Sequence, residues 1–170
     1  MKKLLFIAIA IIGFSTISFG QTGASATAKT SATVITPISI TKSVDLDFGT
    51  LAVNSTNGGT VVLVPAGTRT PTGGVTLPNI SGSPAAAKFT VSGQASSTYA
   101  ITLPTSSITL TDGSGHSMSV GTFTSTPSGT GNTGTGSEDV LVGATLTVQP
   151  GQVAGLYTNN SDLVVKVDYN

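Results

Sequence analysis

The chain has 170 residues, no cysteine, and seven basic side chains balanced by seven acidic ones. Only 8% of its residues are charged, which excludes the clustered lysines and arginines that nucleic acid binding requires. Without cysteine there is no disulfide and no thiolate ligand for zinc, so any core must be held by packing alone.

Residues 1–20 predict a secretory signal peptide. Lys2 and Lys3 give it a positive start, residues 4–12 form an apolar run, and Ser18-Phe19-Gly20 is a small-x-small cleavage site. The apolar run is shorter than the roughly 20 residues that span a membrane, although an uncleaved N-terminal anchor is the alternative.

We therefore expect an exported mature chain, residues 21–170, located in the periplasm, at the cell surface or outside the cell. It has no transmembrane segment after signal cleavage. Removing the two lysines leaves five basic and seven acidic side chains, a net charge of −2. The remaining length fits one domain, since about 100–150 residues is the commonest domain size.

The mature chain has strand patterns separated by turn residues and no segment with helical apolar spacing. The first clear alternation points Val44, Leu46 and Phe48 inward and places Asp45 and Asp47 outside. The β-branched run at residues 60–64 predicts a central strand buried on both faces. Two further strands have these inward residues: Ala87, Phe89 and Val91 in one, and Tyr99, Ile101 and Leu103 in the other.

A hairpin is predicted next, because Asp112-Gly113 is a strong turn signal. Ile108 and Leu110 lead into this turn, and Met118 and Val120 follow it. Another strand is expected over residues 140–148. The C-terminal strand points Leu163, Val165, Val167 and Tyr169 in one direction. Eight or nine short strands predict an all-β fold, a β-sandwich more readily than a barrel.

Two stretches are predicted to lie outside the core. Residues 124–136 are almost devoid of apolar side chains, so we expect a mobile loop. Residues 21–33 form an N-terminal arm whose only candidates for burial are alanines, and the sandwich domain is expected over 34–170. The alanines at alternate positions are Ala24, Ala26 and Ala28, with Ala32 further on. Because the chain ends on an amphipathic strand, this arm is the one unclaimed segment that could cover the strand's free edge.

The sequence predicts no catalytic, cofactor or metal site. His116, the single histidine, lies at the predicted hairpin tip, and there is no G-x-S-x-G motif to accompany it. Residues 129–134 match G-x-G-x-x-G but lack the preceding strand and following helix that bind phosphate. The carboxylate pairs Asp45/Asp47 and Glu138/Asp139 are too few for calcium and are expected to be solvated. We therefore expect that the protein is not an enzyme.

The order of motifs resembles that of the DUF4402 family, which are exported bacterial proteins of unknown function. They are similar in pattern to spore coat protein U and to fimbrial subunits of the chaperone–usher type. The motifs that carry the resemblance are Pro37-Ile38-Ser39-Ile40, Leu46-Asp47-Phe48-Gly49, Phe89-Thr90-Val91-Ser92-Gly93, Tyr99-Ala100-Ile101-Thr102-Leu103-Pro104 and Val165-Lys166-Val167-Asp168-Tyr169-Asn170.

From the fimbrial relatives, the resemblance implies an immunoglobulin-like antiparallel sandwich that lacks a strand and is completed by the arm of the next subunit. The residues that it assigns to assembly are Ala24, Ala26 and Ala28 in the arm, and Leu163, Val165, Val167 and Tyr169 in the C-terminal strand. It also implies an export chaperone and an outer-membrane usher as partners. The chain departs from these relatives in having no subunit disulfide, small donor residues, and a Gly155 that only approximately matches the C-terminal motif.

Two functions remain open at this point. The first is a secreted or cell-surface structural subunit, pilin- or coat-like, that self-associates or joins other surface subunits by β-strand addition. The second is a self-complete, monomeric secreted binding module of unknown ligand. In that case residues 24–35 fold back as the first strand of their own sheet.

Overall fold

The computed structural model describes residues 23–80 and 82–170, and within these ranges all regular structure is β-strand. Residues 35–170 form a compact unit, whereas residues 23–38 contain no strand. Every strand pair is antiparallel, so the predicted all-β antiparallel class is confirmed. In the described ranges no helix is long and apolar enough to cross a membrane. The predicted signal peptide at residues 1–20 lies outside the described residues.

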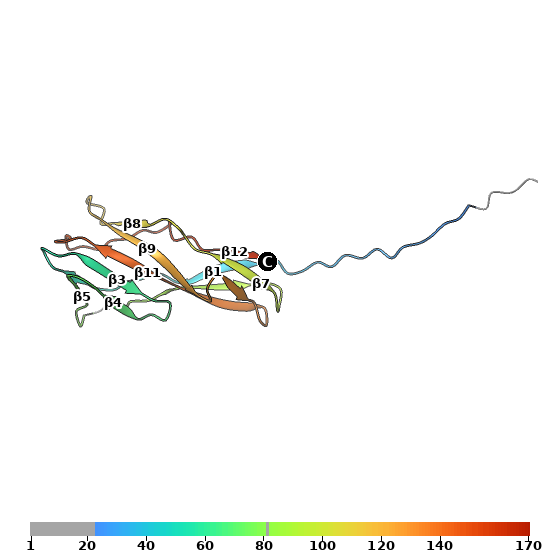
Figure 1. The fold of residues 1–170 in the computed structure, drawn as a ribbon, viewed down its shortest axis with the longest axis horizontal. Coiled ribbons are helices and arrows are strands. Elements are labelled where there is room, and N and C mark those ends of the chain that lie inside the picture. Colours follow the sequence, from blue (N-terminus) through green and yellow to red (C-terminus); the bar gives the residue numbers. More distant parts are fainter. Residues whose placement is uncertain (1–22, 81) are drawn as a thin grey trace, which may run out of the picture. The chain divides into compact units, whose positions relative to one another are not determined.

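The largest sheet contains seven strands, ordered β1-β6-β11-β3-β4, with β9 paired to β11 and β8 paired to β9 (Figure 1). Its strands are β1 (Ser39–Val44), β3 (Gly59–Leu63), β4 (Arg69–Pro71), β6 (Ala87–Ser92), β8 (Ile108–Thr111), β9 (Ser117–Thr126) and β11 (Ser137–Val148). A second sheet has the order β10-β7-β12, formed by β7 (Thr98–Thr102), β10 (Thr130–Asn132) and β12 (Lys166–Tyr169). The smallest sheet pairs β2 (Ala52–Val53) with β5 (Val75–Thr76).

Strand β11 is the centre of the large sheet. One of its edges pairs with β9, while the other pairs first with β6, from Ser137 to Val142, and then with β3, from Ala144 to Val148. The change of partner falls at Gly143, where a Cβ atom would lie 2.2 Å from the carbonyl oxygen of Leu63. A glycine is therefore required for the two partner strands to reach β11 this closely.

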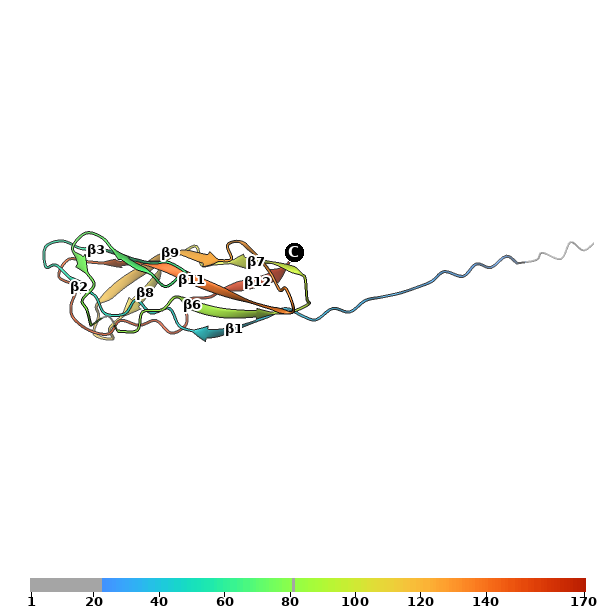
Figure 2. The same cartoon turned by 90° about the horizontal axis from the view of Figure 1, so that it is seen from below.

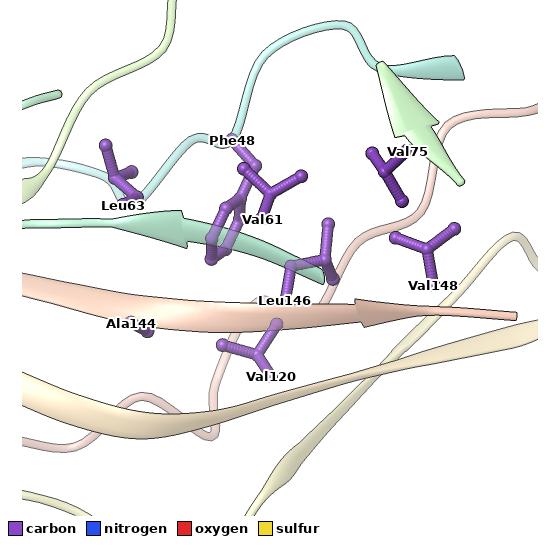
Figure 3. Packing of buried hydrophobic residues seen from close by; sticks show 8 residues of the cluster. All are labelled: Phe48, Val61, Leu63, Val75, Val120, Ala144, Leu146 and Val148. Carbon is purple, nitrogen blue, oxygen red and sulfur yellow. The ribbon is translucent and has the colours of Figure 1, made fainter. Parts of the chain in front are cut away.

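Two buried clusters share β11. Cluster 1 lies under the β2–β5 pair, and Figure 3 shows Phe48 among its aliphatic neighbours. Its buried members are Phe48, Val61, Leu63, Val75, Val120, Ala144, Leu146 and Val148. Cluster 2 lies between the large sheet and the β7–β12 pair, whose strands are seen in Figure 2. Its buried members are Ala87, Phe89, Val91, Tyr99, Ile101, Val140, Val142 and Val165.

The burial of alternate residues confirms the predicted faces of β6 and β7. In β6, Ala87, Phe89 and Val91 are buried while the residues between them are half-buried, as period-two alternation requires. The predicted hairpin is also confirmed, with Ile108 opposite Val120. Its connection is longer than a two-residue turn, because β8 ends at Thr111 and β9 begins at Ser117.

Three expectations about strands are wrong. Residues 60–64 are buried on one face only, since Val61 and Leu63 are buried whereas Val62 is half-buried and Val64 is exposed. Val44 is also exposed, because β1 ends there and its register with β6 shifts between Lys42 and Val44.

The third correction concerns residues 124–136, which are not a mobile loop. This stretch contains the end of β9 and the whole of β10, and Thr133 is fully buried. The Thr133 hydroxyl oxygen accepts a hydrogen bond from the Ser97 N–H at 3.2 Å, and the hydroxyl donates to the carbonyl of Gln94. Hydroxyl groups rather than apolar side chains therefore anchor this segment.

Candidate functional site

The C-terminal strand β12 has one paired edge and one edge that no described strand covers. Its paired edge lies against β7, and the Asn170 N–H donates to the Thr98 carbonyl at 3.3 Å. Backbone groups of an antiparallel strand point to alternate sides, so the N–H and C=O groups of Val167 and Tyr169 point away from β7. These groups form a row of donors and acceptors that an added strand can bind.

Strand β1 presents a similar edge nearby. It pairs with β6 alone among the described strands, and it approaches β12. Apolar side chains along this opening, Ile38 and Ile40 on one side and Val167 and Tyr169 on the other, pack against cluster 2 but stay half-buried. The core is therefore incompletely covered between these two strands.

A groove with a volume of about 1180 Å³ lies at the end of β1, where Lys42 and Val44 line it together with Leu163 from the segment before β12. Its first rim is formed by residues 42–53, and its second rim by residues 152–161 together with Leu163. The floor comes from four strands of the large sheet. Floor residues include Phe89 of β6, Leu110 of β8, Met118 and Phe123 of β9, and Leu146 of β11.

The groove presents apolar side chains to solvent on both rims. On the first rim Val44 is 38% exposed, and on the second Val153 and Leu156 are 47% and 82% exposed. Large apolar residues around a cavity of this size are typical of a surface that a partner covers. The volume slightly exceeds the 300–1,000 Å³ or so of ordinary small-molecule pockets.

Hydrogen bonds to the rest of the unit hold the first rim in place. The Arg69 guanidinium donates from Nη1 to the carbonyls of Phe48 and Thr50, at 2.6 and 3.1 Å. Asp47 and Ala85 exchange two backbone hydrogen bonds of 2.8 Å each. These hydrogen bonds tie the backbone of the first rim to Arg69 and Ala85.

The second rim is held in the same manner. Thr158 and Thr111 exchange two backbone hydrogen bonds of 2.9 and 3.0 Å, which tie the rim to the end of β8. The Tyr157 hydroxyl donates to the Val153 carbonyl at 2.8 Å and accepts from Gln152 Nε2 at 2.9 Å. Both rims are therefore held by hydrogen bonds to other parts of the unit.

The opening is closed at the end where Thr36 precedes β1. The Tyr169 hydroxyl donates to the Thr36 carbonyl at 2.8 Å and accepts from the Gln94 N–H at 2.5 Å. The Thr36 N–H in turn donates to Gln94 Oε1 at 3.3 Å. This cluster was not foreseen from the sequence, since no local pattern relates a threonine near the start of the unit to a tyrosine 133 residues later.

The predicted C-terminal assembly residues serve the protein's own core. Val165 is buried, and Leu163, Val167 and Tyr169 are half-buried against cluster 2, which confirms the predicted alternation. The strand itself is shorter than expected, covering only Lys166–Tyr169. Because these side chains face inward, what β12 offers a partner is its backbone edge.

The predicted arm residues lie in a segment without strands. Ala24, Ala26 and Ala28 are exposed, as is every side chain from residue 23 to residue 34. Val34 is 95% exposed. No strand is formed by the described part of the arm, and Ala24, Ala26 and Ala28 are exposed at alternate positions along it.

The groups considered for catalysis stabilise turns. His116 is exposed at the β8–β9 tip, and its Nδ1 lies 2.6 Å from Asp112 Oδ2. The hydrogen bond with His116 is the main cause that lowers the pKa of Asp112, helped by the backbone N–H groups of Ser114 and His116. Residues 129–134 contain β10, so this glycine-rich stretch forms an edge strand where a phosphate-binding loop would need a helix.

The carboxylates considered for calcium have partners within the protein. Asp139 accepts from Lys88 at 2.7 Å, the main cause of its lowered pKa, and from Thr90 at 2.8 Å. Glu138 lies on the other face of β11 and accepts from the Tyr99 hydroxyl at 2.7 Å. Burial, followed by this contact with Glu138, raises the pKa of Tyr99. In residues 23–80 and 82–170 no three potential metal-binding side chains of His, Cys, Asp or Glu gather at one point.

Comparison with known proteins gives one match. The family model described as "Domain of unknown function (DUF4402)" matches residues 38–169, a range that includes every described strand from β1 to β12. The match therefore covers both open edges and both rims of the groove. No curated protein and no solved structure shows significant similarity to the chain.

Proposed function

The chain belongs to the DUF4402 family, and from its groove and unpaired edges we propose that it is an exported structural subunit that polymerises by β-strand addition. The arm of one copy lies in the groove of the next and pairs with the free edge of β12 or β1. Such a contact is head-to-tail, so it produces an open filament unless the rotation between copies closes a ring.

The observation that carries this proposal is the groove of about 1180 Å³, whose rims expose Val44, Val153 and Leu156. When a chain covers exposed rim residues such as Leu156, burial lowers the free energy by roughly 25 cal/mol per Å² of apolar surface. The unpaired backbone groups of Val167 and Tyr169 supply hydrogen bonds at one end of the same opening. An extended peptide satisfies both features together.

The arm is the occupant that best fits the opening in length. Residues 21–33 span about 40 Å when extended at roughly 3.3 Å per residue. The first rim, residues 42–53, needs a strand of similar length to follow it. The arm's alternate alanines would face the groove floor, and their small size predicts a contact whose affinity depends more on backbone pairing than on side-chain pockets.

On this proposal the fold is an immunoglobulin-like sandwich with one strand missing, and the arm supplies that strand in trans. An unfilled apolar groove exposes core residues before assembly, which is the situation that an export chaperone relieves. The proposal therefore includes a chaperone, an outer-membrane usher and a final position at the cell surface. It includes no enzymatic activity.

The test is to place charges on one face of the arm or the other. Ala26→Asp with Ala28→Asp puts two carboxylates on the face predicted to enter the groove, where burying an unpaired charge costs several kcal/mol. We expect this variant of the mature protein to lose the concentration-dependent oligomers that light scattering detects in the wild type.

The matched control is Ser25→Asp with Thr27→Asp, which adds the same charge to the opposite face of the same segment. The control is expected to oligomerise as the wild type does. Equal loss in both variants would show a general charge effect and contradict the proposed register. A wild-type protein that stays monomeric at high concentration would remove the assembly function and favour the monomeric binding module, with the groove open to a peptide from another protein.

A further inference from the structure

The approach to β1 is held by hydrogen bonds on both sides of one residue. The N–H of Thr36 is bound by Gln94, and its carbonyl is bound by the hydroxyl of Tyr169. Gly93 makes room for this contact, because a Cβ atom at that position would lie 2.2 Å from the Tyr169 hydroxyl oxygen. Tyr169 thus reaches across from β12 to the chain that precedes β1.

The position of Thr36 along the sheet decides what the arm can reach. Ser39, the first residue of β1, lies opposite Ser92, so Thr36 lies beyond that end of the pair, next to Gln94. The first rim of the groove starts at Lys42, toward the other end of β1. An arm that entered its own groove would therefore have to reverse direction between residue 34 and β1, and then run back along the free edge of β1.

Two features oppose that reversal. Pro37 disfavours the helical conformation of the residue before it, which favours an extended Thr36. A reversal at this point would also break the hydrogen bonds that Thr36 makes with Gln94 and Tyr169.

We infer that Thr36, Gln94 and Tyr169 form a latch that keeps the arm out of its own groove and so selects a second copy of the chain as its partner. The inference rests on the proposed function, since it concerns which groove the arm enters. The latch itself is a positioning device: it touches the root of the arm and leaves the groove floor unchanged. Opening the latch should convert trans pairing into pairing within one chain.

Three variants open the latch by different means. Tyr169→Phe removes the hydroxyl and keeps the ring, Gly93→Ala displaces the hydroxyl sterically, and Gln94→Ala removes the acceptor of the Thr36 N–H. Tyr99→Phe is the matched control, because it removes a phenol hydroxyl that binds Glu138 and does not touch Thr36. Circular dichroism establishes that each mature variant is folded, and the variants that fold are compared.

The two readouts are the oligomer fraction by light scattering and the rate of tryptic cleavage after Lys29 in the isolated monomer. Lys29 lies within the arm, so an arm that has added to its own sheet protects it. We expect the latch variants to shift the equilibrium from oligomer to monomer by about five- to tenfold, the change that one or two lost hydrogen bonds produce. Their monomers should be cleaved after Lys29 more slowly than wild-type monomer, whereas Tyr99→Phe should match the wild type in both readouts.

Each result bears on the latch separately from the proposed function. Latch variants that oligomerise and are cleaved like the wild type would overturn the inference while leaving polymerisation intact. If the wild type is monomeric and is cleaved faster than the latch variants, the latch stands and the polymerisation proposal fails. If all proteins are monomeric and are cleaved at one rate, both fail.

Discussion

The two buried clusters share strand β11 but differ in what covers them. Cluster 2 lies under β7 and β12, which are paired strands of five and four residues. Cluster 1 lies under β2 and β5, which are two residues each, and under the first rim. The groove reaches the floor of cluster 1 at Val120 and Leu146 and touches cluster 2 mainly through Phe89. Cluster 1 therefore has the shorter strands over it, whereas the open edges of β1 and β12 border cluster 2.

The largest expected effect on stability, which tests the difference between the two clusters, comes from removing one phenylalanine from each. Phe48 in cluster 1 and Phe89 in cluster 2 are nearly equally buried, at 7% and 8% exposed. Phe48→Ala and Phe89→Ala should each lower the free energy of unfolding by about 3–5 kcal/mol, a large part of the 5–15 kcal/mol or so typical of a domain. Chemical denaturation of the monomer measures both losses.

Equal losses would show that cluster 1 is as tightly packed as cluster 2 despite its thinner cover. A much smaller loss for Phe48→Ala would show that the groove leaves this side chain loosely held. If either variant melted within a couple of degrees of the parent, the inward direction of that side chain would be wrong.

A smaller effect is expected from proline on the two sides of β12. The alternation of backbone groups places the N–H of Asp168 toward β7 and the N–H of Val167 toward the free edge. Asp168→Pro removes a hydrogen bond of the sheet and should lower the free energy of unfolding by about 1–3 kcal/mol. Val167→Pro leaves the pairing with β7 intact, so it should cost less stability.

The same pair of variants separates folding from assembly. Val167→Pro removes a donor from the edge that an added strand would use, so oligomers detected by light scattering should weaken in this variant although its fold is retained. Asp168→Pro keeps that donor. If Val167→Pro were the more destabilising of the two in thermal unfolding, the assignment of the free edge would be reversed.

The smallest effect concerns two carboxyls, the half-buried Asp112 at the β8–β9 tip and the exposed Asp139 on the cluster 2 half of β11. Both have a pKa in the folded state below the unfolded value of about 3.9, because of His116 and Lys88 respectively. Their contributions to stability are therefore present above that unfolded value and are lost as the pH falls through the lower folded pKa. Solvent screening keeps the contribution of the exposed Asp139 small.

Acid unfolding curves of Asp112→Asn and Asp139→Asn check this sign. Each variant should lose stability less steeply than the wild type below about pH 4. Asp168→Asn, which removes the same charge from β12, controls for the change in net charge. A steeper acid limb in either test variant would contradict the direction of the pKa shift.

Local alternation was enough to predict the faces of β6, β7 and β12, because burial on one side of a strand imposes a period of two on its sequence. It failed where polar groups fill the interior. Thr133 is buried through hydrogen bonds with Ser97 and Gln94, and no composition rule distinguishes such a threonine from one in a loop. The first residues of β11, Ser137 to Asp139, are also polar. Here too a polar group has a partner within the protein, since Glu138 accepts a hydrogen bond from the Tyr99 hydroxyl.

The groove could not be predicted, because its two rims are about 100 residues apart in the sequence. Neither rim contains a local pattern that relates it to the other, and long-range contacts such as Asp47 with Ala85 and Thr158 with Thr111 hold them in place. The sequence did indicate which segments have no predicted partner strand. Whether such a segment lies beside an opening depends on the tertiary structure.

Strand β11 also sets the order in which the protein can fold. It lies at residues 137–148, yet it is the partner of β3, β6 and β9, which all precede it in the chain. During synthesis these three strands cannot pair with β11, and their apolar faces stay exposed, until the chain has been made as far as residue 148. Folds built from such distant pairings form slowly. The central sheet therefore cannot close until β11 is available to pair with β3, β6 and β9.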